Sequence, residues 1–351
     1  MKALIIVSGV VLGLLLGMYN GLEKPKTLWW KFTVIFFVIL LTVLTFYPPV
    51  AANFSTSKYL SEALPEYKGN LLVDIVPNSQ KFDTLQNKWT IRVSNNIPKY
   101  IEANLAIYSK ELPQVFNANG SAPTKLVIKA RFDSNKNEFV YFNLASINPI
   151  LTFPVVPGLE EQIRIMNYHV PVAWISVLAY LFAMIFSIQY LKTRNIEYDL
   201  KATAAAEIGT IFTILATVTG MIWAKLNWGS FWNWDPRETS IFILLLIYGA
   251  YFALRSALEN EELKARLSSV YSIIAFITVP FFVFILPRLL TGLHPGSSND
   301  NSSGPVVSAQ ANTLNFLQQI TFSLGFTSIS LIFFWMLNIR IRLKKIVHKI
   351  I

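Results

Sequence analysis

The chain has 351 residues, of which 53% are hydrophobic and only 14% are charged, and its mean hydropathy is +0.46. Soluble domains carry about a quarter charged residues, so this composition predicts a membrane protein. The net charge of +10 is typical of cytoplasmic loops in such a protein and does not indicate nucleic-acid binding. The chain has no cysteine, which excludes disulfides, thiolate metal sites and cysteine nucleophiles.

Seven apolar segments have about the 20 residues that a membrane-spanning helix needs. They cover residues 3–20, 29–48, 170–191, 207–226, 239–257, 268–288 and 314–338. The first segment follows Lys2 and has a short apolar core, which is also a feature of signal peptides. No small-x-small cleavage pattern follows Met18, and the next apolar segment comes at once, so we expect a retained helix.

Basic residues occur in every second connection between these segments. The sets are Lys24, Lys26 and Lys31; Lys192, Arg194 and Lys201; Arg255, Lys264 and Arg266; and Arg340, Arg342, Lys344, Lys345 and Lys349. The positive-inside rule therefore places these four connections in the cytoplasm and the loops 49–169, 227–238 and 289–313 outside. The basic tail, with His348, is expected to lie against anionic membrane lipid.

The stretch from about 52 to 160 mixes charged and apolar residues evenly. Two alternating runs, at 125–132 and 138–142, flank the turn Asp133-Ser-Asn-Lys-Asn137 and predict a β-hairpin. Residues 98–113 are expected to form a short amphipathic helix after Pro98. These patterns predict a small α+β domain outside the membrane, followed later by a Ser/Asn/Gly-rich loop at 296–311.

The loop between the segments at 207–226 and 239–257 is unusually rich in aromatic residues. Residues 228–235 read Trp-Gly-Ser-Phe-Trp-Asn-Trp-Asp, with apolar runs on both sides. Indole rings favour the membrane–water boundary, where the ring is half apolar and its N–H finds a partner. So much aromatic surface beside a carboxylate indicates a flat, hydrophobic ligand with polar edges.

The chain has three histidines, and two of them flank this loop in the predicted topology. His169 precedes one membrane segment and His294 follows another, both on the outer side. A lone interfacial histidine is usually only hydrated. Two neutral imidazoles at one level can instead ligate one haem iron from opposite faces. Zinc or copper remains an alternative, although two histidines without cysteine or clustered carboxylates make a poor zinc site.

The residues at this point resemble a known superfamily. The stretch from Trp228 to Asp235 resembles the tryptophan-rich motif of the haem-handling proteins CcmC, CcmF and CcsA of cytochrome c maturation. Residues 168–174, which include His169 and Trp174, resemble the first outer histidine segment of CcmC. Residues 207–225 resemble its helix leading into the motif, and His294 stands where its second outer histidine stands. The resemblance covers about residues 165–345.

The resemblance to CcmC implies the roles of individual residues. His169 and His294 would be the two axial ligands of a non-covalent haem b, and no residue is assigned a catalytic role. The aromatic platform would be formed by Trp228, Phe231, Trp232 and Trp234, with Gly229 for a tight loop, Asp235 as a hydrogen-bond acceptor and Trp174 near the first ligand. Arg237 and Arg288 are candidates for pairing with the haem propionates, because arginine matches carboxylate geometry.

Some residues depart from the CcmC pattern. Position 231 is Phe where CcmC usually has Trp, and Asp235-Pro-Arg-Glu-Thr resembles the corresponding stretch of CcsA. CcsA and CcmF carry further histidines within membrane helices, whereas every predicted spanning segment of this chain lacks histidine. That absence favours CcmC. The segment 3–20 and the stretch 52–160 are not part of the ordinary CcmC pattern.

The expected fold is an all-α multipass membrane protein, with six CcmC-like helices, one extra N-terminal helix and an inserted α+β domain. The predicted divisions are residues 1–50 for two helices, 51–165 for the insert, 166–345 for the haem-handling domain and 346–351 for the basic tail. The resemblance implies delivery of haem, at the outer face of a bacterial cytoplasmic membrane, to a CcmE-like chaperone with help from an ABC transporter. A CcsA-like synthetase acting on apocytochrome c, a haem exporter and a membrane scaffold are the alternatives.

Overall fold

The computed structural model describes residues 2–64, 66–95, 100–116, 125–155, 159–294, 296–299 and 316–350. The chain divides into two compact units. Met1–Thr45 and Gln162–Ile351 form the first unit, and Phe46–Glu161 form the second. Most of the predicted Ser/Asn/Gly-rich loop lies outside the described residues.

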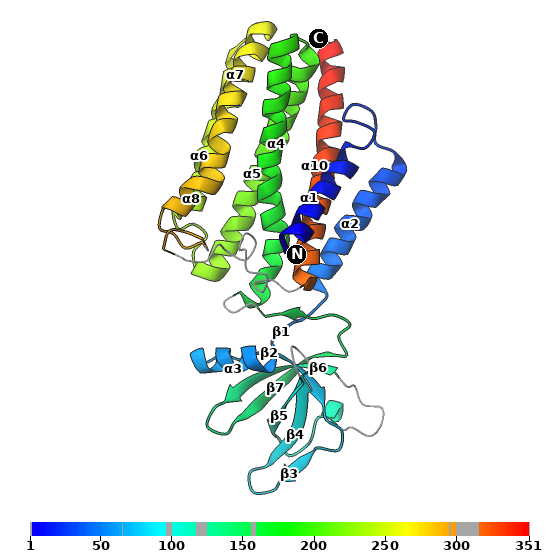
Figure 1. Ribbon diagram of the computed structural model, residues 1–351, viewed down its shortest axis with the longest axis vertical. Coiled ribbons are helices and arrows are strands. Elements are labelled where there is room, and N and C mark those ends of the chain that lie inside the picture. The colour runs from blue at the N-terminus through cyan, green and yellow to red at the C-terminus, as the bar shows by residue number, and fades with distance from the viewer. Residues whose placement is uncertain are drawn as a thin grey trace. The chain divides into compact units, whose positions relative to one another are not determined.

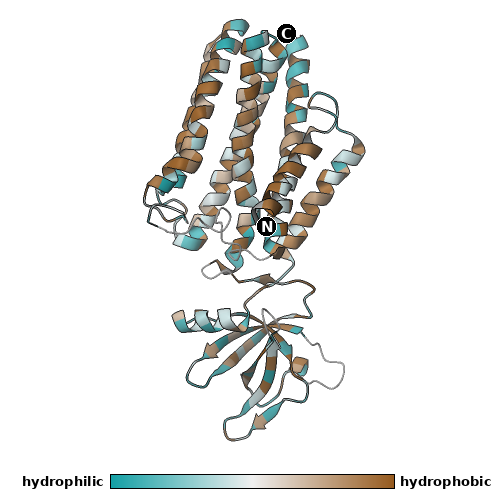
Figure 2. Cartoon of the chain, viewed as in Figure 1, coloured by the Kyte–Doolittle hydropathy of each residue, from teal (hydrophilic) through white to brown (hydrophobic). Residues whose placement is uncertain are grey.

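The first unit is a bundle of long helices (Figure 1). Six helices in the described part of the chain are long and apolar enough to cross a membrane, so the prediction of a multipass membrane protein is confirmed. They are α2 (Leu28–Phe46), α4 (Ile163–Thr193), α5 (Ile196–Trp228), α6 (Pro236–Ala257), α7 (Glu261–Pro280) with its continuation, and α10 (Phe316–Ile350). Figure 2 shows that hydrophobic residues dominate the middle of these helices.

The predicted N-terminal helix is present as α1 (Lys2–Met18). With 17 residues, α1 is shorter than each of the six spanning helices. A helix of that length spans about 25 Å, which is less than the roughly 30 Å of a bilayer core. The helix α1 packs along α10, and the Thr327 hydroxyl of α10 donates to the Gly9 carbonyl at 3.0 Å.

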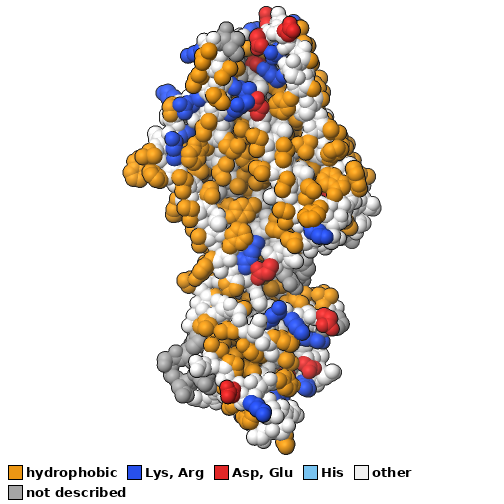
Figure 3. Space-filling view, turned by 180° about the vertical axis from the view of Figure 1, so that it is seen from behind, with side chains coloured by type: hydrophobic (Ala, Val, Ile, Leu, Met, Phe, Trp, Pro, Cys, Tyr) orange, Lys and Arg blue, Asp and Glu red, His pale blue; other side chains and the backbone are white. Residues whose placement is uncertain are grey.

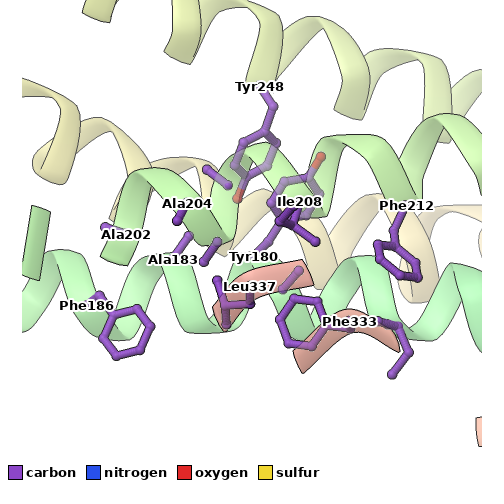
Figure 4. Close-up of a cluster of buried hydrophobic side chains, with 14 of the residues drawn as sticks. Tyr180, Ala183, Phe186, Ala202, Ala204, Ile208, Phe212, Tyr248, Phe333 and Leu337 are labelled. Atoms are coloured by element: carbon purple, nitrogen blue, oxygen red, sulfur yellow. The ribbon is translucent and has the colours of Figure 1, made fainter. Parts of the chain in front are cut away.

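The core of the bundle lies between α4, α5, α6 and α10, where aromatic and small side chains alternate (Figure 4). The rings of Tyr180 and Tyr248 stack with their centroids 3.5 Å apart, and neither is exposed. Phe333 and Leu337 of α10 close the cluster from the opposite side. This packing fixes α4 and α5 against each other. The candidate site lies near the N-terminal end of α4 and the C-terminal end of α5.

One end of the bundle is highly charged, and its ion pairs join the four basic connections that the sequence predicts on one side of the membrane. Asp199 accepts two hydrogen bonds from Arg255, at 2.7 and 2.9 Å. Glu207 pairs with Arg340 at 2.6 Å and Lys344 at 2.9 Å. Glu23 pairs with Lys201 and Lys345. Figure 3 shows Lys and Arg side chains gathered toward this end of the helical unit.

Five of the six spanning helices are longer than the sequence predicts, and this changes the place of some residues along them. The helix α5 begins at Ile196, so Glu207 lies about three turns inside it rather than at its start. The helix α4 begins at Ile163, so His169 lies in its second turn rather than ahead of it. After α7 the chain continues through a π-helical turn, Phe281–Ile285, and the short helix α8 (Leu286–Leu289).

The second unit is built mainly of β-strands, with one helix, α3 (Phe54–Ala63). Its larger sheet has the order β2-β6-β7-β5-β4-β3, and a further pairing of β2 with β4 closes five of these strands into a ring. The strands are β2 (Gly69–Ile75), β3 (Lys81–Asp83), β4 (Lys88–Asn95), β5 (Ile101–Tyr108), β6 (Lys125–Asp133) and β7 (Glu138–Ile147). A short parallel pair, β1 (Val50–Ala51) with β8 (Phe153–Pro154), joins the two ends of the unit.

The closed ring is antiparallel except where β5 runs parallel to β7. This strand order is that of the OB fold, a five-stranded Greek-key barrel. Its interior is filled by alternating side chains such as Leu71, Ile91, Leu105 and Ile128, none of them exposed. The unit is therefore a small β-barrel with a flanking helix, and the predicted α+β description is only partly correct.

The predicted hairpin is present, but the predicted helix at 98–113 is wrong. Strands β6 and β7 pair across the expected turn, where Asp133 Oδ1 accepts the amide of Asn135 at 3.0 Å. Residues 101–108 form strand β5 instead of a helix, and 96–99 lie outside the described residues. Ala103, Leu105 and Ile107 alternate along this segment, face the barrel core, and pair with β4. The apolar residues of this segment recur at every second position, which is the period of a strand and not that of a helix.

Candidate functional site

The aromatic loop begins where α5 ends. Trp228 is the last residue of α5, and Gly229 caps the helix in a left-handed conformation with φ of +80°. Glycine adopts this conformation without the steric cost that a Cβ brings. The Lys225 ammonium donates to the Gly229 carbonyl at 2.8 Å and lies over the ring of Phe231. The chain therefore turns sharply and reaches α6 within seven residues.

Asp235 ends the loop and holds it in place. Asp235 caps α6 by accepting the amide of Arg237 at 2.9 Å, and the Glu238 carboxylate accepts the amides of Asn233 at 2.7 Å and Asp235 at 3.3 Å. This reciprocal arrangement is a capping box, which satisfies helix N–H groups that otherwise have no partner. The same Asp235 carboxylate accepts the amide of Leu293 at 2.6 Å.

His294 is the third partner of Asp235. Its Nδ1 lies 2.7 Å from Asp235 Oδ1. Burial would raise the pKa of Asp235, but the hydrogen bonds from His294, Arg237 and Leu293 outweigh it and lower the pKa to about 2. The carboxylate is therefore ionised at neutral pH and can only accept. Nδ1 of His294 is therefore the donor of this hydrogen bond, and in the neutral imidazole Nε2 is the nitrogen with the lone pair.

His169 reaches the same tautomer through a different partner. Its Nδ1 lies 2.9 Å from the Thr219 hydroxyl oxygen of α5. That hydroxyl donates its own proton to the Leu215 carbonyl at 2.8 Å, so it accepts from His169. His169 Nε2 is then also a lone-pair nitrogen. The two imidazoles lie within electrostatic range of one another, although 124 positions separate them in the sequence.

The predicted aromatic residues differ in their neighbours, and one of them contacts an imidazole. The Trp228 ring meets the His294 ring edge-on with centroids 4.6 Å apart. Trp232 packs against Trp234 at 5.7 Å, and Trp234 and Phe231 are exposed. Trp174 lies on α4 with its ring 5.0 Å from that of Phe284, in the π-helical turn. The structure thus brings Trp228 to a histidine, leaves Phe231 and Trp234 exposed, and packs Trp232 partly buried between Trp234 and Phe242.

Trp234 has a strained backbone. Its φ is +55°, in the left-handed region that residues with a Cβ avoid at a cost of about 1–2 kcal/mol. The ring is 69% exposed, so the strain is not offset by burial. Strain of this kind that persists at a surface is typical of functional sites.

A change of Trp234 to glycine should therefore separate stability from ligand binding. We expect the free energy of unfolding of Trp234→Gly to stay within about 1 kcal/mol of the parent, because relief of strain offsets the lost ring contact. Haem affinity should fall, because an outward aromatic surface is lost. Thermal unfolding and haem titration measure the two effects. A large loss of stability, or unchanged haem affinity, would contradict this interpretation.

The two predicted arginines lie on α6 and α8. Arg237 is half-buried at the start of α6, and Arg288 is exposed and donates to the Phe284 carbonyl at 2.7 Å. They lie within electrostatic range of each other. Two neighbouring cations beside the site favour an anionic ligand group.

Comparison with known proteins shows the family of this chain. The family model described as "Heme exporter protein C", CcmC, matches residues 140–349, which is more than half of the chain. The chain belongs to the CcmC family. It is 33% identical over 170 residues to the Heme exporter protein C of Paracoccus denitrificans, covering 48% of this chain and 70% of that protein.

Two further CcmC relatives cover less of their own length. The Escherichia coli K12 Heme exporter protein C is 33% identical over 140 residues, which is 40% of this chain and 57% of that protein. A ccmC-like mitochondrial protein of Marchantia polymorpha, named for cytochrome c biosynthesis, is 40% identical over 124 residues, or 35% and 52% of the two chains. The chain thus spans about half to 70% of the length of these relatives.

The residues of this CcmC-family protein fit haem better than a bare metal ion. No group of three or more His, Cys, Asp or Glu that could hold a metal ion occurs among the residues that the structure describes. Haem needs only two protein ligands, because its porphyrin supplies four nitrogens. His169 and His294 each have a hydrogen-bond partner at Nδ1, as metal-ligating imidazoles usually do, so in the neutral rings Nε2 would be the nitrogen that meets the iron.

Some residues of the CcmC-family site were not found from the sequence. Thr219, Glu238 and Leu293 hold the two histidines or Asp235 in place. The capping-box sequence Asp235-Pro-Arg-Glu238 is the signal that could have revealed the role of Glu238. Thr219 gives no such signal, because threonines on spanning helices are common and its pairing with His169 joins two helices.

Gly220 provides a direct test of how His169 is positioned. A Cβ at Gly220 would lie 3.0 Å from His169 Cε1, whereas a Cβ at Gly249 would meet nothing within 4 Å. We expect Gly220→Ala to displace the imidazole and lower haem affinity by about tenfold, as changes beside metal ligands typically do. Gly249→Ala, a matched glycine on a spanning helix, should leave affinity unchanged. Equal affinities of the two variants in a haem titration would contradict this role.

Proposed function

We propose that this protein holds haem b non-covalently at the outer face of a bacterial cytoplasmic membrane and passes it to an acceptor during cytochrome c maturation. The observation that carries the proposal is the matched state of His169 and His294, each with Nδ1 bonded and Nε2 available. The names of the relatives, which refer to a haem exporter and to cytochrome c biosynthesis, support the same ligand and pathway.

The remaining residues would position the ligand rather than react with it. His169 and His294 would bind the iron from opposite faces, and Trp228 would hold the His294 ring. Trp234 and Phe231 would offer exposed aromatic surface to the porphyrin, with Trp232 behind them. Trp174, which packs against Phe284, would be a further aromatic contact for the haem. Arg237 and Arg288 would pair with the two propionates. When bound, the haem would supply the iron and four of its ligands.

The outer face is proposed from charge. The ion-paired end of the bundle holds the basic connections, and the positive-inside rule places such an end in the cytoplasm. The aromatic loop and His294 follow the opposite ends of their helices. The partners proposed are a CcmE-like haem chaperone, an ABC transporter of the same system, and membrane lipid at the basic tail. Apocytochrome c is the acceptor if the protein acts like CcsA.

Trapping the acceptor tests this function. The full-length protein, expressed with a CcmE-like chaperone and an apocytochrome c, should co-purify with haem and with the chaperone. The His169→Ala/His294→Ala variant should recover neither haem nor the chaperone–haem adduct. Recovery of apocytochrome instead of the chaperone would assign the CcsA-like role. Rescue of cytochrome c maturation by a haem-free protein would contradict haem handling altogether.

A further inference from the structure

The two candidate ligands differ in what their Nδ1 atoms bind. His294 donates to the Asp235 carboxylate at 2.7 Å, and the Asp235 side chain is only 1% exposed. His169 donates to a neutral hydroxyl, that of Thr219, at 2.9 Å. The two histidines therefore have the same tautomer but unequal partners.

The carboxylate partner makes His294 the stronger donor to a metal. A carboxylate that accepts the Nδ1 proton raises the basicity of Nε2, whereas a neutral hydroxyl has a much weaker effect. Hydrogen bonding around an axial ligand is one of the ways in which a protein tunes haem iron. The bond from Nε2 of His294 to iron should consequently be stronger than that from His169.

His294 is also held from more directions than His169. Asp235 is fixed by the amides of Arg237 and Leu293, so its carboxylate cannot turn away from the imidazole. The Trp228 ring packs on the imidazole, and the His294 carbonyl accepts the Ser297 hydroxyl at 2.7 Å. For His169, Nδ1 meets the Thr219 hydroxyl, and the imidazole also hydrogen-bonds the Ala216 backbone carbonyl, so both of these partners are neutral.

We propose that His294 is the retained ligand of the haem iron and that His169 is the ligand that leaves when haem is passed on. This inference rests on the proposed function. The bond between iron and His169 Nε2 breaks with its electron pair staying on the imidazole. A donor atom of the acceptor then supplies the pair for the new bond, so the exchange needs no oxidant and moves no proton. Asp235 and Thr219 act as positioning residues that make the two sides unequal.

Carbon monoxide can report which ligand leaves. In the reduced, haem-loaded, full-length protein, CO should replace one histidine, and the C–O stretching frequency depends on the ligand that stays opposite. The CO adduct of the parent should match that of His169→Ala, in which only His294 remains. A match to His294→Ala, or identical frequencies for both variants, would overturn the inference while leaving haem handling intact. Failure of the parent to bind haem would instead overturn the proposed function.

Two further variants test the cause of the asymmetry. Asp235→Asn keeps a good helix cap but removes the charge, so it should shift the C–O frequency of the parent adduct and raise the midpoint potential. Thr219→Val, a matched change on the other side, should shift neither. Equal effects of the two changes would overturn the role of Asp235.

A measurement without haem guards against misfolding. In haem-free protein labelled with ¹⁵N-histidine, His294 should show an Nδ1–H tautomer that Asp235→Asn alters, while His169 stays unchanged. If Asp235→Asn leaves the His294 signals as they are in the parent, the proposed carboxylate effect is wrong.

Haem loss to apomyoglobin should be at least ten times faster from His294→Ala than from His169→Ala, and the reverse order would overturn the proposal.

Discussion

The double variant His169→Ala/His294→Ala should lose the low-spin, two-histidine haem spectrum and bind haem at least about 100-fold more weakly than the parent. Both axial ligands would be gone, and changes even beside metal ligands commonly cost 10–100-fold in affinity. In the proposed site, the Nε2 atoms of these two residues would bind the iron, because their Nδ1 atoms already have partners. Haem titration followed by absorbance measures the effect.

His348→Ala is the matched control for the double variant. His348 lies on the exposed end of α10 within the basic tail, far along the chain from both ligands. We expect its haem spectrum and affinity to equal those of the parent. If the double variant kept its haem content, the assignment of His169 and His294 as ligands would be wrong.

The change Asp199→Ala should destabilise the helical unit by about 3–5 kcal/mol. Asp199 on α5 is 3% exposed and takes two hydrogen bonds from Arg255 on α6. Its removal leaves the Arg255 guanidinium buried without its carboxylate, and the desolvation cost of that charge is then uncompensated. Denaturant unfolding in detergent measures the loss.

Two comparisons make the ion-pair prediction specific. Glu261→Ala removes an exposed partner of Lys264 on α7, and pairs of that kind contribute less than about 1 kcal/mol. Replacing Asp199 and Arg255 together with Leu and Met should be far milder than Asp199→Ala alone, because no charge is left buried. If Asp199→Ala were as mild as Glu261→Ala, the buried pair would not contribute as described.

Much of the helical unit could be predicted from the sequence because spanning helices need long apolar runs. Each of the six spanning helices coincides with a predicted segment, although the helices begin earlier or end later. Polar residues such as Asp199 and Glu207 lie inside these helices in ion pairs, where a hydropathy pattern ends the helix too early. The pattern of apolar residues along a helix cannot reveal that an arginine distant in the sequence pairs with such a carboxylate and offsets the cost of burying its charge.

The insert shows a different limit. The sequence predicts the β6–β7 hairpin because its turn residues and alternation are local. The pairing of β2 with β4 and of β5 with β7, which closes the barrel, joins segments distant in sequence. No local pattern encodes such pairings. The expected helix at 98–113 is wrong for this reason, because residues 101–108 form a strand only by pairing with β4 and β7.

At the candidate site, the sequence predicts which residues are present but not how they bond. His169, His294 and the aromatic loop stand out by residue type and by their place at helix ends. The sequence predicts that Asp235 accepts a hydrogen bond but not from which donors, whereas the structure makes it the common partner of α6, Leu293 and His294. The contact of Thr219 with His169 depends on the packing of α4 against α5, which requires the fold.

The absorbance and electron paramagnetic resonance spectra of the haem-loaded, full-length protein test the central claim most directly. If His169 and His294 bind the iron from opposite faces, the ferric protein should be six-coordinate and low-spin, with the signature of two neutral imidazole ligands. The signal should disappear only when the histidines are replaced. A five-coordinate, high-spin spectrum, or a protein that takes up no haem, would contradict the account.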